Sequence, residues 1–87
     1  MLKDFSFRLR PNVHMYCHEL ICASGGKEYR CIVESSPNHA DTIVFWAEQL
    51  GVPTAQRDQL LQALKSWASQ QSFSYCIYWE NELWAMG

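Results

Sequence analysis

The sequence predicts a single-domain α+β fold, a two-layer sandwich with the order βββ-αα-ββ, in which two helices lie on one face of a mainly antiparallel, five-stranded sheet. Apolar and polar residues alternate near both ends of the chain, at 5–10 and 73–79, with the period of a strand. Between them, 40–50 and 54–68 carry apolar residues at helical spacing. The 87 residues, 48% of them hydrophobic, suffice for one thin core, so we expect 1–87 to form one domain.

Three strands are predicted in the first part of the chain, at 5–10, 13–23 and 28–34. Pro-Asn at 11–12 and Gly-Gly at 25–26 are typical of two-residue hairpin loops. With these loops, both hairpin registers place the same set of side chains on one face: Phe5, Phe7, Leu9, His14, Tyr16, His18, Leu20, Cys22, Tyr29, Cys31 and Val33. Since a slip of one residue would turn this set outwards, the agreement predicts which face is the core.

Two helices are predicted after a Ser-Pro-Asn turn at 36–38. The first covers 40–50, and Gly51 fits the left-handed position that commonly ends a helix. Thr54 is expected to cap the second helix. The apolar stripes of the two helices consist of Ile43, Trp46, Ala47 and Leu50, and of Leu60, Leu61, Leu64, Trp67 and Ala68.

Two strands are predicted to complete the sheet. Residues 73–79 alternate, with Tyr75 and Ile77 on the core face, and Glu-Asn at 80–81 forms a turn. The last strand covers 82–86. We expect its Trp84 and Met86 to face the same way as Ile77.

Charge and hydropathy exclude several classes of protein. The net charge is −2, and residues 36–87 carry two basic and five acidic groups, which argues against nucleic-acid binding. The longest apolar runs are far below the roughly 18 residues that a membrane-spanning helix needs, so we expect no membrane partner. The first residues do not have the pattern of a signal peptide. We therefore expect a cytoplasmic protein with four reduced cysteines.

Histidine and cysteine are the residue types that could carry chemistry here. His14, His18, Cys22 and Cys31 fall on the predicted core face, whereas strand alternation points Cys17 the other way. Their spacing lacks the paired Cys-x-x-Cys pattern of structural zinc sites. We therefore predict no metal, no cofactor and no catalytic residue. A metal-dependent or thiol enzyme built on these side chains is an alternative.

Residues 43–64 resemble a helix-turn-helix, with Ala47 early in the first helix, Gly51 at the turn and Val52 after it. This resemblance implies a nucleic-acid-binding regulator, which is a second alternative. The side chains that would then read the bases are Thr54, Gln56, Arg57 and Gln59.

The function that the sequence favours is a small non-enzymatic protein–protein interaction module. The predicted outer face of the sheet mixes apolar residues with charged ones, and Phe45 falls on the polar side of the first predicted helix. The residues expected to bind a partner are Met15, Ile21, Arg30, Ile32, Phe45 and Tyr78. By analogy of size and charge, such a module could be an inhibitor, an immunity-type protein or a regulatory protein. It would bind another protein, or a second copy as a homodimer, through the open sheet face or an edge strand.

Overall fold

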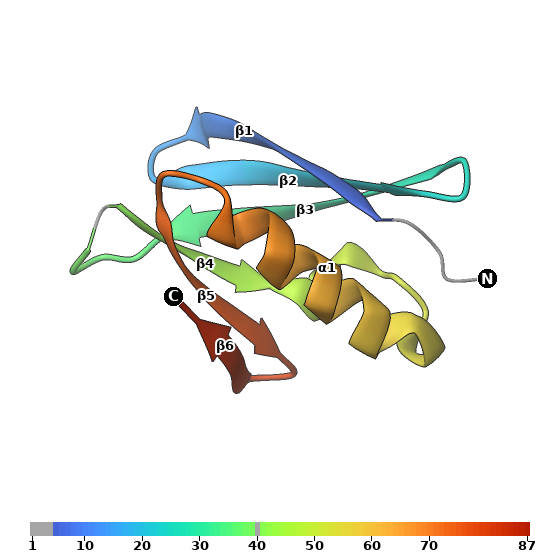
Figure 1. The fold of residues 1–87 in the computed structure, drawn as a ribbon. Helices are drawn as coiled ribbons and strands as arrows, with labels where there is room; N and C mark the ends of the chain where they lie inside the picture. Colours follow the sequence, from blue (N-terminus) through green and yellow to red (C-terminus); the bar gives the residue numbers. More distant parts are fainter. Residues whose placement is uncertain (1–4, 40) are drawn as a thin grey trace.

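A computed structural model describes residues 5–39 and 41–87 (Figure 1). The elements in chain order are β1 (Ser6–His14), β2 (Cys17–Ser24), β3 (Lys27–Ser35), β4 (Thr42–Trp46), the 3₁₀ turns η1 (Ala47–Leu50) and η2 (Thr54–Gln56), α1 (Arg57–Ser69), β5 (Ser74–Trp79) and β6 (Glu82–Met86). The strands form one sheet in the order β1 to β6, antiparallel except for the parallel pair β4–β5. The α+β class is confirmed. The predicted count of five strands and two helices is wrong, because the described residues form six strands and one α-helix.

The second hairpin has the predicted register, with Ser24 opposite Lys27 and both intervening glycines at positive φ. The first hairpin is longer than predicted. β1 continues through a bulge between Arg10 and His14, and the chain turns at Met15 and Tyr16, four residues beyond the predicted loop. The longer β1 can pair along the whole length of β2, and Asn12 absorbs the irregularity at φ 55°.

This correction leaves most of the predicted core face intact. Leu9 pairs with Leu20, whereas the predicted loop would have placed it opposite His14, a shift of six residues (20 − 14 = 6). An even shift preserves which side chains share a face. His14 and Tyr16 are the exceptions, because the bulge pairs His14 with Cys17 on the outer face and Tyr16 lies exposed in the turn.

The segment predicted as the first helix forms a strand and a short 3₁₀ turn. Ile43 and Phe45 are buried, while Thr42, Val44 and Trp46 are half-buried on the other side. The β-branched run 42–44 favours this conformation, and β5 supplies a strand for it to pair with. Phe45 was expected on an exposed side of a helix, and this is wrong, since it is fully buried.

The helix α1 packs across one face of the sheet (Figure 1). Its buried side chains are those predicted: Leu60, Leu61, Leu64 and Ala68. Trp67 is half-buried beside them and reaches across this face of the sheet, with ring centroids 5.7 Å from Phe7 in β1 and 6.2 Å from Phe45 in β4. Thr54 does not cap this helix, because it begins the preceding 3₁₀ turn without a capping hydrogen bond from a side chain.

The hairpin β5–β6 turns at Glu80 and Asn81, as predicted, and both residues have positive φ. A bulge next to Ile77 and Tyr78 changes the register of β6. Ala85 therefore faces the core opposite Ile77, and Met86 faces outwards opposite Cys76, which corrects the predicted orientation of Met86. Among the residues that the structure describes, no helix is long and apolar enough to cross a membrane.

Candidate functional site

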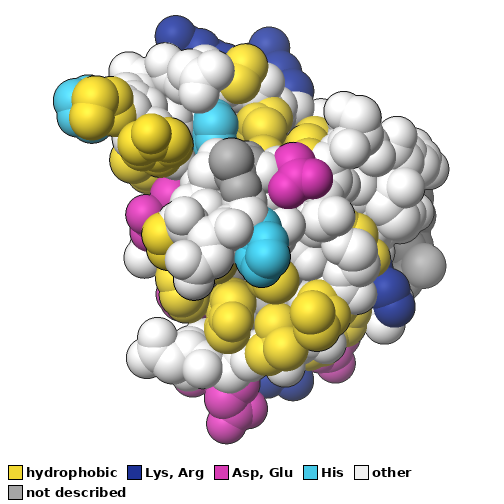
Figure 2. Space-filling model, turned by 90° about the vertical axis from the view of Figure 1, so that its left-hand side faces the viewer, with side chains coloured by type: hydrophobic (Ala, Val, Ile, Leu, Met, Phe, Trp, Pro, Cys, Tyr) yellow, Lys and Arg dark blue, Asp and Glu magenta, His cyan; other side chains and the backbone are white. Residues whose placement is uncertain are grey.

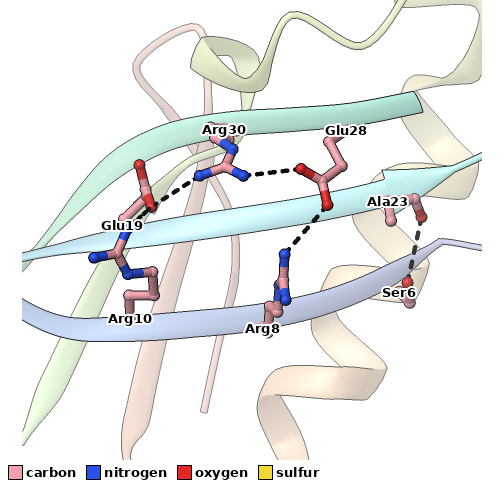
Figure 3. Close-up of polar contacts among 7 residues, drawn as sticks. All are labelled: Ser6, Arg8, Arg10, Glu19, Ala23, Glu28 and Arg30. Carbon is pink, nitrogen blue, oxygen red and sulfur yellow. Dashed lines mark hydrogen bonds and ion pairs between the residues drawn. The ribbon is translucent and has the colours of Figure 1, made fainter.

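The outer face of the sheet, opposite α1, carries a continuous chain of ion pairs on β1, β2 and β3 (Figure 3). The successive contacts are Arg10–Glu19 at 3.0 Å, Glu19–Arg30 at 3.4 Å, Arg30–Glu28 at 2.9 Å and Glu28–Arg8 at 3.2 Å. The hydrogen bond and the positive charge of Arg30 lower the pKa of the Glu28 carboxyl. We call these five residues the charged half of the outer face.

The charged half covers Ile21, which is only 3% exposed. Arg8 and Arg30 are its neighbours on the two adjacent strands, and the methylene stems of arginines commonly cover apolar surface in this way. The expectation that Ile21 contacts a partner is therefore wrong. Arg30 is already paired with Glu19 and Glu28. Ile32 remains 48% exposed at the margin of this half.

The other half of the outer face, on β4, β5 and β6, is apolar and aromatic. Trp46 and Tyr78 stack there with ring centroids 4.8 Å apart. Leu83 and Met86 from β6 are 50% and 66% exposed and lie opposite Tyr78 and Cys76. We call the following residues the aromatic face: Val44, Trp46, Cys76, Tyr78, Leu83 and Met86. Tyr78 is the member that the sequence analysis expected to bind a partner.

The tip of the first hairpin adds further exposed hydrophobic residues. Met15 and Tyr16 are 75% and 69% exposed, and Figure 2 shows hydrophobic side chains gathered at this end of the molecule. A hollow of about 550 Å³ lies beside the tip, and we call it the tip hollow. Its lining residues are Met15, Tyr16, Glu34, Ser35, Ser36 and Pro37.

A second hollow connects the tip hollow to the aromatic face. It measures about 430 Å³, shares Ser36 with the tip hollow, and extends to Val44, Tyr78 and Met86. Glu34 and Val44 are also direct partners across β3 and β4. The exposed hairpin tip and the aromatic face therefore belong to one continuous surface.

A buried histidine beside the tip hollow superficially resembles half of a catalytic pair. His18 Nε2 lies 2.8 Å from Ser35 Oγ. The other ring nitrogen, Nδ1, accepts a hydrogen bond of 2.9 Å from the backbone N–H of Asn12. Because Nδ1 is an acceptor, the proton of the neutral ring lies on Nε2 and points at Ser35. In this state Nε2 has no lone pair with which to take a proton from the hydroxyl, so the pair does not form an activated nucleophile.

The metal-dependent alternative would need at least three metal-ligating side chains gathered at one point. Within 5–39 and 41–87, no three His, Cys, Asp or Glu side chains gather in a group that could hold a metal ion. Cys22 and Cys31 are buried in the core, where His18 is bonded to backbone and serine. The helix-turn-helix interpretation is wrong, since the segment expected as its first helix contains β4.

The four thiols should differ sharply in reactivity. Burial raises the pKa of Cys22 to about 11 and that of Cys31 to about 12, so both are protonated at neutral pH. We expect iodoacetamide to modify the half-buried Cys17 and Cys76 in the native protein, and Cys22 and Cys31 only after denaturation. Mass spectrometry of the alkylated peptides measures this. Equal labelling of all four thiols under native conditions would contradict the burial.

The same shifts determine how pH affects stability through these thiols. Unfolding returns Cys22 and Cys31 toward the ordinary pKa of 9.0, so above that pH the unfolded chain holds fewer protons than the native one. Their contribution to stability is therefore present below about pH 9 and is lost as the pH rises from there through the folded values.

Comparisons of the chain with protein-family models, with curated proteins and with solved structures find no match. The candidate site is therefore defined by its geometry. Sequence reasoning missed Trp46 and Met86. The helix expected at 40–50 assigned Trp46 to the core, and the bulge in β6 turned Met86 outwards. The run of β-branched and apolar residues at 42–46, which also fits a buried strand, is the signal that could have identified β4 and with it the outward position of Trp46.

Proposed function

We propose that the chain is a small non-enzymatic protein-binding module that contacts its partner through the aromatic face. The observation that carries this proposal is the contrast between the two halves of the outer face. The charged half pairs its arginines with its glutamates, whereas the aromatic face exposes Leu83 and Met86 beside the stacked rings of Trp46 and Tyr78.

The residue types of the aromatic face favour a protein as the partner. Trp and Tyr are enriched among the residues that dominate binding energy in protein interfaces, because their large rings bury much area with few rotatable bonds. Contiguous exposed apolar side chains beside a charged margin are typical of interaction sites. Size and acidic charge suggest by analogy an inhibitor, an immunity-type protein or a regulatory protein.

A pair of lysine substitutions tests this proposal. We expect a Leu83→Lys/Met86→Lys variant to lose the partner that the wild-type chain captures from cells of its source, with affinity reduced at least about tenfold. Both side chains are half exposed or more, so the far-ultraviolet circular dichroism should be unchanged. Quantitative mass spectrometry of the captured proteins and titration of the identified partner measure the effect.

The control is Ile32→Lys, which adds one positive charge at the margin of the charged half, at a residue about as exposed as Leu83. It should capture the partner as the wild type does. Unchanged capture by the Leu83→Lys/Met86→Lys variant would refute the aromatic face as the binding surface. Light scattering on the same three proteins tests homodimerisation, because a dimer lost only in the double variant would identify a second copy as the partner.

A further inference from the structure

We infer that the tip hollow receives an arginine side chain of the partner protein. This inference deepens the proposed function, on which it rests for the partner, by naming the chemistry that the partner presents. The hollow adjoins the second hollow through Ser36, and that second hollow reaches the aromatic face. One bound protein could therefore occupy both.

The lining of the tip hollow matches the two parts of an arginine side chain. Met15, Tyr16 and Pro37 provide apolar walls for the aliphatic stem. Glu34 provides a carboxylate, whose two oxygens can accept two parallel hydrogen bonds from a guanidinium. The ring of Tyr16 offers a surface on which the planar guanidinium can stack.

The ion pairing of Glu34 distinguishes it from Glu19 and Glu28, the glutamates of the charged half. Glu19 and Glu28 are both paired with arginines of the same chain. Glu34 forms no ion pair with any residue in 5–39 or 41–87, and no basic residue lines the tip hollow. Burying this carboxylate beneath an apolar partner would leave an unpaired charge, and an acidic partner would be repelled. A basic group is the complement that avoids both penalties.

The hollow is held in shape before any partner arrives. Tyr16 has a φ of 57°, a left-handed conformation that is uncommon for an aromatic residue. Its carbonyl oxygen accepts a hydrogen bond of 2.9 Å from the N–H of Ser35, and Ser35 Oγ is in turn bonded to the buried His18. The tip is thus tied to the end of β3, where Glu34 lies. A rigid site loses less entropy when it binds a side chain than a flexible one does.

Arginine is favoured over lysine on geometric grounds. A guanidinium is planar, so it can stack on Tyr16 and face Glu34 with two donors at once, whereas an ammonium is a strongly hydrated point charge. We therefore expect isolated side-chain probes to show the same preference for arginine over lysine. Nα-acetyl-arginine amide should bind more tightly than Nα-acetyl-lysine amide, and the neutral analogue Nα-acetyl-citrulline amide should not bind measurably.

Titration of the ¹⁵N-labelled chain with these three amides, followed by NMR, tests the inference. We expect the arginine probe to shift the amide signals of Glu34, Ser35 and Ser36 at millimolar concentration. Glu34→Gln should weaken this binding by about tenfold, since it removes the charge and keeps the shape. The conservative control Glu28→Gln, on the charged half, should leave it unchanged. Equal shifts with citrulline, shifts confined to other residues, or no shifts would each overturn the inference.

Capture of the partner by the variants distinguishes a failure of this inference from a failure of the proposed function. If Glu34→Gln weakens capture of the partner as well as binding of the arginine probe, both proposals are supported. If Leu83→Lys/Met86→Lys abolishes capture and Glu34→Gln leaves it unchanged, the aromatic face is supported and the arginine inference fails. If capture survives in the Leu83→Lys/Met86→Lys variant while the arginine probe still shifts the tip hollow, the proposed function fails alone.

Discussion

Replacing Phe45 with alanine is expected to lower the free energy of unfolding by about 3–5 kcal/mol, the range typical of a buried phenylalanine. The side chain is fully buried and lies in an aromatic cluster, with ring centroids 6.2 Å from Trp67 and 6.1 Å from Phe73. Alanine leaves a cavity between β4 and α1 that neither rigid element can close. Since 87 residues support a total stability of about 4–13 kcal/mol, much of it would be lost.

Urea denaturation monitored by circular dichroism measures this change. The matched control is Ile32→Ala, which removes a β-branched side chain from an exposed position of the same sheet and should change stability by less than about 0.5 kcal/mol. A loss below about 1 kcal/mol for Phe45→Ala would contradict its place in the core. It would instead favour the exposed position that helical spacing alone assigned to it.

Replacing His18 with phenylalanine is expected to destabilise the fold by about 1–3 kcal/mol, because it removes both hydrogen bonds of a buried ring and leaves the groups at the other end of each bond without that partner. The ring joins the N–H of Asn12 in the bulge of β1 to the hydroxyl of Ser35 at the end of β3. Phenylalanine keeps the apolar volume and removes both hydrogen bonds. Urea denaturation gives the loss in stability, and hydrogen exchange at the Asn12 amide shows whether the bulge has been released.

Ser35→Ala serves as the partial control, because it removes one of the two hydrogen bonds and leaves Asn12 bonded. We expect it to cost about 1 kcal/mol and to leave the protection of the Asn12 amide unchanged. Long-range ¹H–¹⁵N correlation spectra of the histidine ring should also show the proton on Nε2 in the wild type. A proton on Nδ1 would be incompatible with the hydrogen bond from Asn12 and would reopen the question of a Ser–His pair.

The sequence predicted those parts of the fold whose local pattern and tertiary surroundings agree. The hairpin at Gly25 and Gly26, the buried stripe of α1 and the turn at Glu80 and Asn81 are all confirmed. The core face of β1 and β2 is also largely correct despite the wrong loop, because a shift by an even number of residues leaves alternation unchanged. Periodicity therefore determined the faces more reliably than it determined the turns.

The parts of the fold that the sequence did not predict depend on contacts between residues that are distant in the chain. The apolar residues of 43–50 fit both a helix and a strand, and the pairing of β4 with β5 decided between them. Neither the cover over Ile21 nor the hydrogen bonds of His18 can be read from one strand, because each requires side chains from neighbouring strands. The sequence therefore predicted only the type of candidate site, an apolar surface on the outer face of the sheet. Of the residues expected to bind a partner, Tyr78 lies on the aromatic face, and Met15 lies in the exposed turn of the first hairpin instead of in a strand.

The parallel pairing of β4 with β5 bears on the order in which the chain can fold during synthesis. Each hairpin among β1, β2 and β3 joins neighbouring segments, so it can close soon after its second strand emerges. β4 must instead wait for η1, η2 and α1 to be made before its partner β5 exists. Until then Phe45 lacks the strand that shields one side of it. Completion of the core therefore waits until β5 has been made, and the aromatic face forms with it.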